Sequence, residues 1–257
     1  MLRFMLLIAT ALSEEMETVL KLCTRRTKIR TTGVPLWTGM RAGETLHLLK
    51  LGVGPVHSAS VLERALAGLQ PTRILVTGYA GALDPELKQG ELVVVDRADM
   101  LSEESRGVPL GQIGLGGGWP LAGAEQLLSR AHAAGLAVRR GATLTSPCII
   151  GTPEHKRVLF QRFHAAIVDM ETAALARIAS ARGIPLSCVR AVSDTADDDF
   201  LASLSYSPGS GSLRRAARTL AAGGWLRRYS QWRERSAAAR ASLSRFLACY
   251  LDKLNDE

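Results

Sequence analysis

The stretch from residue 166 to residue 194 reads AIVDMETAALARIASARGIPLSCVRAVSD, and its hydrophobic pattern changes twice along its length. Short apolar, β-rich runs at Ala166–Val168 and Leu186–Val192 predict two strands. Between them, Met170, Ala173 and Ala174 begin a set of apolar residues that recur three and four positions apart, which predicts a helix. A strand, a helix and a second strand in this order are typical of an α/β fold.

The same alternation continues along most of the chain. A second amphipathic helix is expected where Val61, Leu62, Ala65, Leu66 and Leu69 recur at helical spacing. Further strands are expected at Arg3–Ala9, Leu46–Leu51, Ile74–Thr77, Leu92–Asp96 and Val138–Leu144. We therefore predict an α/β three-layer sandwich, in which a central mixed, largely parallel twisted sheet is flanked by helices.

The apolar N-terminal stretch allows two interpretations, a secretory signal or a buried first strand. Its apolar run is short, one basic residue precedes it, and Glu14, Glu15 and Glu17 follow almost at once. This charge pattern favours a strand that leads through a loop into a helix. No run approaches the ~20 apolar residues of a membrane span, so we expect a cytoplasmic protein.

Composition and charge limit the class of protein further. The chain has 257 residues, of which 47% are hydrophobic and 22% charged, enough for one large domain. Residues 212–257 hold ten basic and four acidic side chains, so this tail carries +6 of the net charge of +8. We expect a catalytic domain over residues 1–211 and a basic helical extension over 212–257, with no nucleic-acid-binding surface on the body.

Glycine and cysteine positions add two local expectations. Ser105–Pro120 contains six glycines and is expected to be a loop that could act as a lid; Ser203–Ser212 is expected to be a second break. The four cysteines lie far apart without a CxxC pair and are expected to be reduced thiols. The histidines form no spaced cluster, and dinucleotide and P-loop fingerprints are absent, so we predict no metal and no cofactor.

Several motifs resemble the nucleoside phosphorylase superfamily, in particular its methylthioadenosine/adenosylhomocysteine nucleosidases. The two most specific are VDMETAALA at 168–176 and VRAVSDTAD at 189–197. TGYAGAL at 77–83 with GELVV at 90–94, Gly52-Val53-Gly54, and ALSEE at 11–15 add weaker matches. The resemblance covers about residues 3 to 200. It implies an enzyme that cleaves the N-glycosidic bond of a purine nucleoside and that forms a homodimer or a larger assembly.

The resemblance assigns roles to three carboxylates. Asp194 matches the acid that protonates the departing purine, a step that improves the leaving group. Glu171 matches the carboxylate that binds the ribose hydroxyls, and Glu15 the one that orients or deprotonates the attacking water. Each also has a purely structural interpretation: a helix N-cap for Asp194, and acidic residues near helix N-termini for the two glutamates.

Other residues are placed near the substrate by the same match. Met170 is expected to pack under the sugar, Ile149 and Ile150 to line the purine, and Arg190 and Ser193 to support the acid. Gly78 and Tyr79 lie in a motif that contacts the ribose and the acceptor, but the family usually has Ser where Tyr79 stands. Ser146-Pro147 replaces a usual Gly-Asp pair, and because proline has no N–H donor, recognition of the base is expected to differ.

The basic tail has an amphipathic stripe, formed by Trp225, Tyr229, Trp232, Ser236, Ala239, Leu243, Phe246 and Tyr250. One interpretation is a helix packed on the body or on a neighbouring subunit. The other is attachment to an anionic membrane surface, because Trp and Arg on one helix suit that interface. Similar Arg- and Ala-rich ends occur in a hopanoid-associated branch of the superfamily, which handles an adenosine that carries a lipid.

Three functions remain open on the sequence alone. The leading one is hydrolysis of an adenosine-type nucleoside, with water as acceptor and release of the base. The second is phosphorolysis, including that of a lipid-linked (hopanoid) adenosine, although no Arg-rich phosphate loop is recognisable near Gly52–Pro55. The third is a non-catalytic protein that binds a nucleoside or a lipid.

Overall fold

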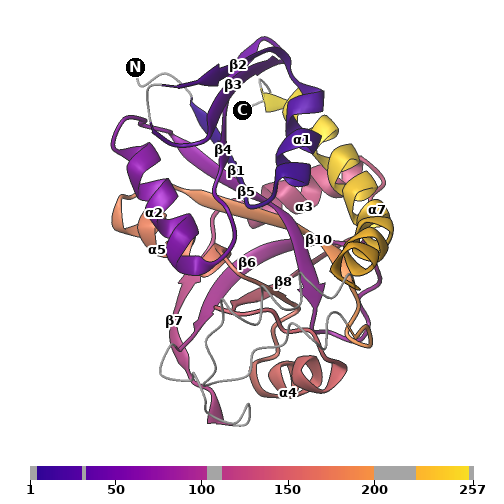
Figure 1. Ribbon diagram of the computed structural model, residues 1–257. Helices are drawn as coiled ribbons and strands as arrows, with labels where there is room; N and C mark the ends of the chain where they lie inside the picture. Colours follow the sequence, from indigo (N-terminus) through magenta and orange to yellow (C-terminus); the bar gives the residue numbers. More distant parts are fainter. Residues whose placement is uncertain (1–4, 31–32, 103–111, 200–223, 255–257) are drawn as a thin grey trace.

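The first strand lies in the middle of the sheet. The computed structural model describes residues 5–30, 33–102, 112–199 and 224–254, and in 224–235 only the backbone (Figure 1). β1 (Leu6–Thr10) is buried along its whole length and runs parallel to both of its neighbours, β4 (Glu44–Lys50) and β5 (Arg73–Ala82). The strand expected near the N-terminus is therefore confirmed.

The other half of the sheet closes on itself. β10 (Leu186–Asp194) runs parallel to β5 and antiparallel to β6 (Leu92–Leu101). β6 runs parallel to β8 (Val138–Thr145), β8 parallel to β9 (Ile167–Asp169), and β9 returns antiparallel to β5. The predicted α/β fold with a mixed sheet and flanking helices is confirmed. The closed ring formed by β5, β10, β6, β8 and β9 was not predicted from the sequence.

Helices cover both faces of the sheet, as Figure 1 shows. Two pack on one face, α2 (Pro55–Leu66) and α5 (Thr172–Ala181). Three pack on the other, α1 (Ser13–Leu22), α3 (Ala124–Ala133) and α7 (Gly224–Asp252). The side chains of β1 alternate between the two resulting cores, as a strand buried on both faces requires. α4 (Pro153–Phe163) covers a third, smaller core through Leu159.

The C-terminal tail is part of the second core. From Ser236 onward the expected stripe is buried, and Leu243, Phe246 and Tyr250 pack against the sheet and α1. Asp252 at the end of α7 forms an ion pair with Arg41 at 2.6 Å. The prediction of a helix packed on the body is confirmed for this part. The expected break at 203–212 lies outside the described residues. The side chains of the first part of the stripe, Trp225, Tyr229 and Trp232, are likewise outside the described part of the structure.

Three strands escaped the sequence pattern. β2 (Thr24–Ile29) and β3 (Leu36–Arg41) extend the sheet beyond β4 in antiparallel fashion, and β2 is polar and largely exposed. The loop expected over Ser105–Pro120 is wrong for its last part, where β7 (Leu115–Pro120) pairs antiparallel with β6. Its glycines serve the pairing, since a Cβ at Gly118 would collide with Asp99 of β6. Residues 105–111 lie outside the described residues.

Candidate active site

The carboxylate of Glu15 is held at the start of α1 by backbone donors. Its Oε2 accepts the N–H groups of Ala11 (2.9 Å) and Leu12 (2.8 Å), so Glu15 caps its own helix from the N3 position. Its Oε1 accepts the N–H of Tyr79 on β5 at 2.8 Å. Burial raises the pKa of this carboxyl, although Arg190 and the three backbone donors act in the opposite direction. A carboxyl of raised pKa is a stronger base than an exposed glutamate.

Gly78 on β5 allows Glu15 and Arg190 to approach each other. Arg190 lies directly opposite Gly78 in the parallel pairing of β10 with β5. A Cβ at Gly78 would collide with the Glu15 carboxylate and would lie 2.8 Å from Nη1 of Arg190. Glycine is therefore required here by the close approach of two charged side chains.

Arg190 is the buried cation of a cluster of carboxylates. It is 1% exposed, and its Nη2 lies 3.0 Å from Oδ2 of Asp169 and 3.6 Å from Oε2 of Glu171, while donating to the Thr172 hydroxyl at 2.8 Å. Burial alone would lower the pKa of the guanidinium, but the neighbouring carboxylates, Asp169 foremost, raise it above its ordinary value. Arg190 therefore carries a permanent charge at the site.

Asp169 orders the start of α5, which carries Glu171. Its Oδ1 accepts the Thr145 hydroxyl at 2.8 Å and the N–H groups of Glu171 (3.3 Å) and Thr172 (3.2 Å), and its Oδ2 accepts the Thr172 hydroxyl. Thr145 in turn accepts the N–H of Ala173 at 2.9 Å. These bonds use the free donors of the first helical turn and fix where the Glu171 side chain begins.

Glu171 lies 4% exposed between Arg190 and the loop before α2. Its Oε1 accepts the N–H of Gly54 at 3.0 Å. Burial raises the pKa of the carboxyl to about 7, against the lowering effect of Arg190 and with a further raising effect of Asp169. At neutral pH Glu171 therefore exists in both the ionised and the protonated form.

Asp194 lies at the carboxyl end of β10, where the pairing with β5 is interrupted by a bulge between Val192 and Asp194. Its Oδ1 accepts the Ser193 hydroxyl at 2.7 Å, and its Oδ2 accepts Nζ of Lys156 at 2.6 Å. A Cβ on Gly81 of β5 would lie 2.9 Å from Oδ2, so the carboxylate packs against the strand backbone. Asp194 is 6% exposed. This ion pair is not indicated by any sequence motif.

The three carboxylates thus surround one segment of β5. Glu15 and Arg190 contact Gly78–Tyr79, Asp194 contacts Gly81, and Glu171 joins the group through Arg190. Glu15 follows β1 and Asp194 ends β10, both parallel to β5, whereas Glu171 follows β9, which runs antiparallel to β5. Ligands of open α/β sheets bind at the carboxyl ends of such parallel strands.

The remaining expected residues are placed less directly. Ser193 contacts Asp194, whereas Met170 and Ile149 are partly buried. Ile150 packs in the small core beneath α4. The Tyr79 ring lies in the core between the sheet and α1, where burial and the Glu15 charge raise its pKa to about 12. Tyr79 therefore offers Glu15 its backbone N–H, and its bulk is accommodated in the core.

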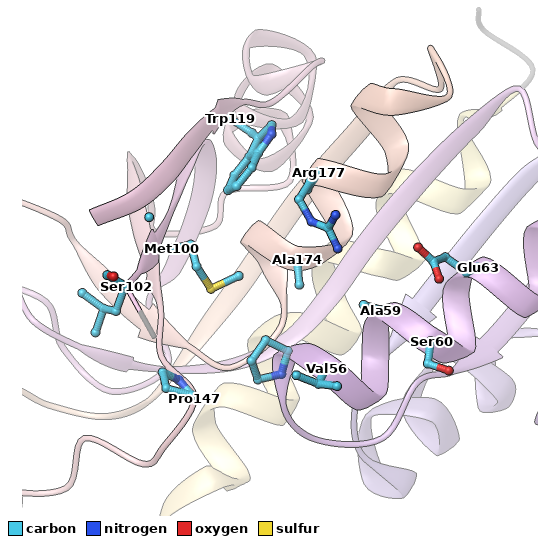
Figure 2. A pocket seen from close by; sticks show the side chains of 13 residues that line it. Val56, Ala59, Ser60, Glu63, Met100, Ser102, Trp119, Pro147, Ala174 and Arg177 are labelled. Carbon is cyan, nitrogen blue, oxygen red and sulfur yellow. The ribbon is translucent and has the colours of Figure 1, made fainter. Parts of the chain in front are cut away.

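A cavity of about 430 Å³ adjoins the cluster (Figure 2). Met100 and Trp119 of β6 and β7 face Val56 and other residues of α2, with Arg177 of α5 between them. Among the described residues that line it, none is a carboxylate of the cluster, but Pro55 follows Gly54, the donor to Glu171. Pro147, which was expected from the sequence to alter recognition of the base, also lines this cavity.

Within the ranges that the structure describes, no group of three or more His, Cys, Asp or Glu side chains is arranged to hold a metal ion. No helix within those ranges is long and apolar enough to cross a bilayer. The four cysteines are free thiols.

Comparison with known proteins gives a consistent result. The model of the phosphorylase superfamily matches residues 5–222. Futalosine hydrolase of Helicobacter pylori strain 26695 superposes with a TM-score of 0.73 at 19% identity, covering 98% of each chain. The 5′-methylthioadenosine/S-adenosylhomocysteine nucleosidase of Neisseria meningitidis, in complex with methylthio-immucillin-A, gives 0.72 at 21% identity, covering 97% of this chain and 99% of the nucleosidase. At such identities the superpositions show a shared fold.

Proposed function

The chain belongs to the phosphorylase superfamily, and we propose that it hydrolyses the N-glycosidic bond of an adenosine-type purine nucleoside and releases the base. The superposed nucleosidases and futalosine hydrolase support this class of reaction, since they share the fold over nearly the whole chain. The finer statements, purine over other bases and water over phosphate, rest on the geometry of the site.

One observation carries the proposal: two buried carboxylates, Glu15 and Asp194, contact residues 78–81 of β5, and a third, Glu171, is joined to them through Arg190. Burying ionisable groups is costly, and a protein retains them where chemistry needs them. Cleavage of a glycosidic bond needs a proton donor for the base, a negative group beside the developing sugar cation, and a base for the nucleophile.

We assign each requirement to one carboxylate. Asp194 protonates a ring nitrogen of the purine, so that the base leaves without a negative charge. Glu171, in its ionised form, accepts the two ribose hydroxyls and stabilises the positive charge that develops on the sugar. Glu15, whose pKa is raised by burial, takes a proton from the attacking water.

The other expected residues have supporting roles in this proposal. Arg190, which the sequence led us to expect beside Asp194, pairs with Asp169 and Glu171 and fixes Glu171. Ser193 orients Asp194 through its hydroxyl, as expected from the sequence. Met170 packs under the sugar, and Ile149 and Ile150 provide an apolar wall and backbone groups for the base. Gly78 and Tyr79 contribute through the strand backbone, where the Tyr79 N–H orients Glu15.

The charges of the site favour water over phosphate as the acceptor. Among the described side chains, the two fully buried cations of the site are Arg190 and Lys156, and each is already engaged by a carboxylate. A phosphate dianion beside Glu15 and Glu171 would need a cation of its own. Phosphorolysis would therefore require an additional Arg or Lys from outside this cluster.

A single assay tests the proposal. The protein is incubated with adenosine, 5′-methylthioadenosine and S-adenosylhomocysteine, with and without phosphate, and free adenine is measured. Release without phosphate supports the hydrolase, and strict dependence on phosphate would replace it by a phosphorylase. Absence of release from a broad nucleoside panel would support a non-catalytic binding protein instead.

The assembly and the role of the tail are further proposals. We propose a homodimer or larger assembly, whose contact includes the exposed apolar side chains beside the cavity, Val53, Val56 and Leu115. Light scattering on the purified protein tests it. Residues 1–211 form the proposed catalytic unit and 212–257 the basic extension. Membrane attachment, as for a lipid-linked substrate, stays a prediction, tested by binding of the full chain and its R227E/R228E variant to anionic vesicles.

A further inference from the structure

Lys156 lies on the apolar face of α4, where a charged residue has no packing role. The neighbouring position on that face, Leu159, is buried in the small core, and Lys156 itself is 0% exposed. A buried ammonium is expensive unless each of its protons is accepted. The position is therefore explained by the partners of the side chain rather than by packing.

Three oxygens accept the ammonium, and all of them belong to the end of β10 and the loop that follows. They are Oδ2 of Asp194 at 2.6 Å, the carbonyl of Thr195 at 2.6 Å and the carbonyl of Asp198 at 3.3 Å. The carboxylate of Asp198 accepts hydrogen bonds from the N–H and the hydroxyl of Thr195, and these bonds hold the loop together. Lys156 thus holds the carboxylate of Asp194 in a fixed place, and the two charges cancel.

This ion pair is inconsistent with Asp194 acting by itself as the proton donor to the leaving base. An ionised carboxylate that accepts an ammonium has no proton to give to a departing base. The pair as a whole, however, does hold one transferable proton, on Nζ of Lys156. Lysine changes its protonation state readily when it is buried, in contrast to arginine.

We propose that Lys156 is a positioning residue that stores the proton of the acid and delivers it to the leaving base through Asp194. This rests on the proposed function, since it gives the source of the proton that the glycosidic cleavage needs. It adds to the site a residue from α4, an element that carries none of the family motifs.

The proton balance of the step is closed. As the bond between C1′ and the base nitrogen breaks, its electron pair stays on the base. Nζ of Lys156 gives a proton to Asp194 and becomes neutral, and Asp194 passes that proton on to a ring nitrogen of the base. The water oxygen forms a bond to C1′ and gives one proton to Glu15. Glu15 then releases its proton to solvent and Lys156 regains one, so that nucleoside and water yield base and free sugar.

The experiment compares two leaving groups in the full-length protein. One substrate is the purine nucleoside that the wild type cleaves fastest, and the other is 4-nitrophenyl β-D-ribofuranoside, whose leaving group needs no protonation. Three variants are measured: Lys156→Met, Lys156→Arg, and Leu159→Ala as a matched control on the same face of α4. The readouts are kcat and its dependence on pH for each substrate.

The proposal predicts a selective loss. Lys156→Arg keeps a cation beside Asp194 but cannot release a proton, so kcat on the purine nucleoside falls by about 10²-fold or more, while the nitrophenyl riboside is cleaved nearly as before. In Lys156→Met the proton resides on the carboxyl alone, a stronger acid than an ammonium, so the alkaline limb of purine cleavage moves to lower pH. Leu159→Ala is expected to change both substrates by the same factor.

Other outcomes would overturn the proposal. Equal losses on both substrates in the Lys156 variants would reduce Lys156 to a structural role, as would a purine pH profile that is unchanged. If the variants do not fold, the wild type provides the test. The ratio of kcat on the purine nucleoside to kcat on the nitrophenyl riboside must then fall at alkaline pH. A ratio that stays constant from neutral to alkaline pH contradicts the proposal. A wild type that cleaves no purine nucleoside, with or without phosphate, would instead refute the proposed function.

Discussion

The two ends of the site neutralise their carboxylates by different means. At one end, Arg190 serves Asp169, Glu171 and, at longer range, Glu15. At the other end, a single lysine, Lys156, meets a single carboxylate, Asp194. An arginine cannot give up its proton in a protein, whereas a lysine can.

The difference matches what each end has to do. The proposed sugar end needs ionised carboxylates in a fixed geometry, and a permanent cation shared among the carboxylates favours their ionised form and holds them in place. The proposed base end needs a proton that leaves and returns in every turnover. Arginine is thus found where the site holds the sugar in place, and lysine where the site transfers a proton.

The largest expected effect is at the base end. Asp194→Asn keeps the shape of the side chain but removes the proton relay, so turnover of a purine nucleoside should fall by about 10²–10⁴-fold. Cleavage of 4-nitrophenyl riboside should be nearly unchanged, because its leaving group needs no acid. Steady-state kinetics on both substrates measure this. A near-normal rate on the purine nucleoside would remove Asp194 from the mechanism.

At the sugar end the expected effect is on stability as well as on rate. Arg190→Met leaves Asp169 and Glu171 buried without their cation, which should lower the free energy of unfolding by about 3–5 kcal/mol. Urea denaturation measures this. The control is Arg140→Met, whose ion pairs with Asp96 and Glu125 lie at the surface and should contribute far less to stability. Equal losses in the two variants would contradict the comparison.

The sequence predicted the sugar end better than the base end. Asp194 and Glu15 come together because β1, β5 and β10 are parallel, so that residues at their carboxyl ends meet at one edge. Glu171 reaches the same place from β9, which runs antiparallel to β5. The central strands and the amphipathic helices follow directly from hydrophobic periodicity. Domain boundaries and residue roles stay predictions.

The partner of Asp194 could not be found in the same way. Lys156 and Asp194 are 38 residues apart and belong to different elements, and no local pattern joins them. The available signal was a lysine on the same helical face as Leu159. β2 and β7 were missed for a related reason: polar or glycine-rich edge strands owe their pairing to a neighbouring strand rather than to their own hydrophobic pattern.

Stability should depend on pH through Glu171. Its pKa is raised to about 7 in the folded protein, so between the ordinary carboxyl pKa and about 7 the folded state holds a proton that the unfolded chain has lost. The free energy of unfolding should therefore fall as pH rises through this window, by up to about 3 kcal/mol. In Glu171→Gln this component should disappear. Urea denaturation of both proteins across this pH range measures it, and identical slopes would contradict it.

The smallest expected effects separate the two ends by substrate. Gly78→Ala pushes against Glu15 and Arg190, which act on every substrate, so it should lower kcat on both the purine nucleoside and 4-nitrophenyl riboside, by up to about 10²-fold for a displacement near 1 Å. At Gly81 the three atoms nearest to an added Cβ all belong to Asp194, so Gly81→Ala should affect the purine nucleoside selectively. Gly68→Ala, where an added Cβ meets open space, is the control and should leave both rates unchanged. If the two strand variants lower both rates in the same ratio, the fixed and the proton-transferring ends are not separate units, because a disturbance at either glycine would then spread through the whole site.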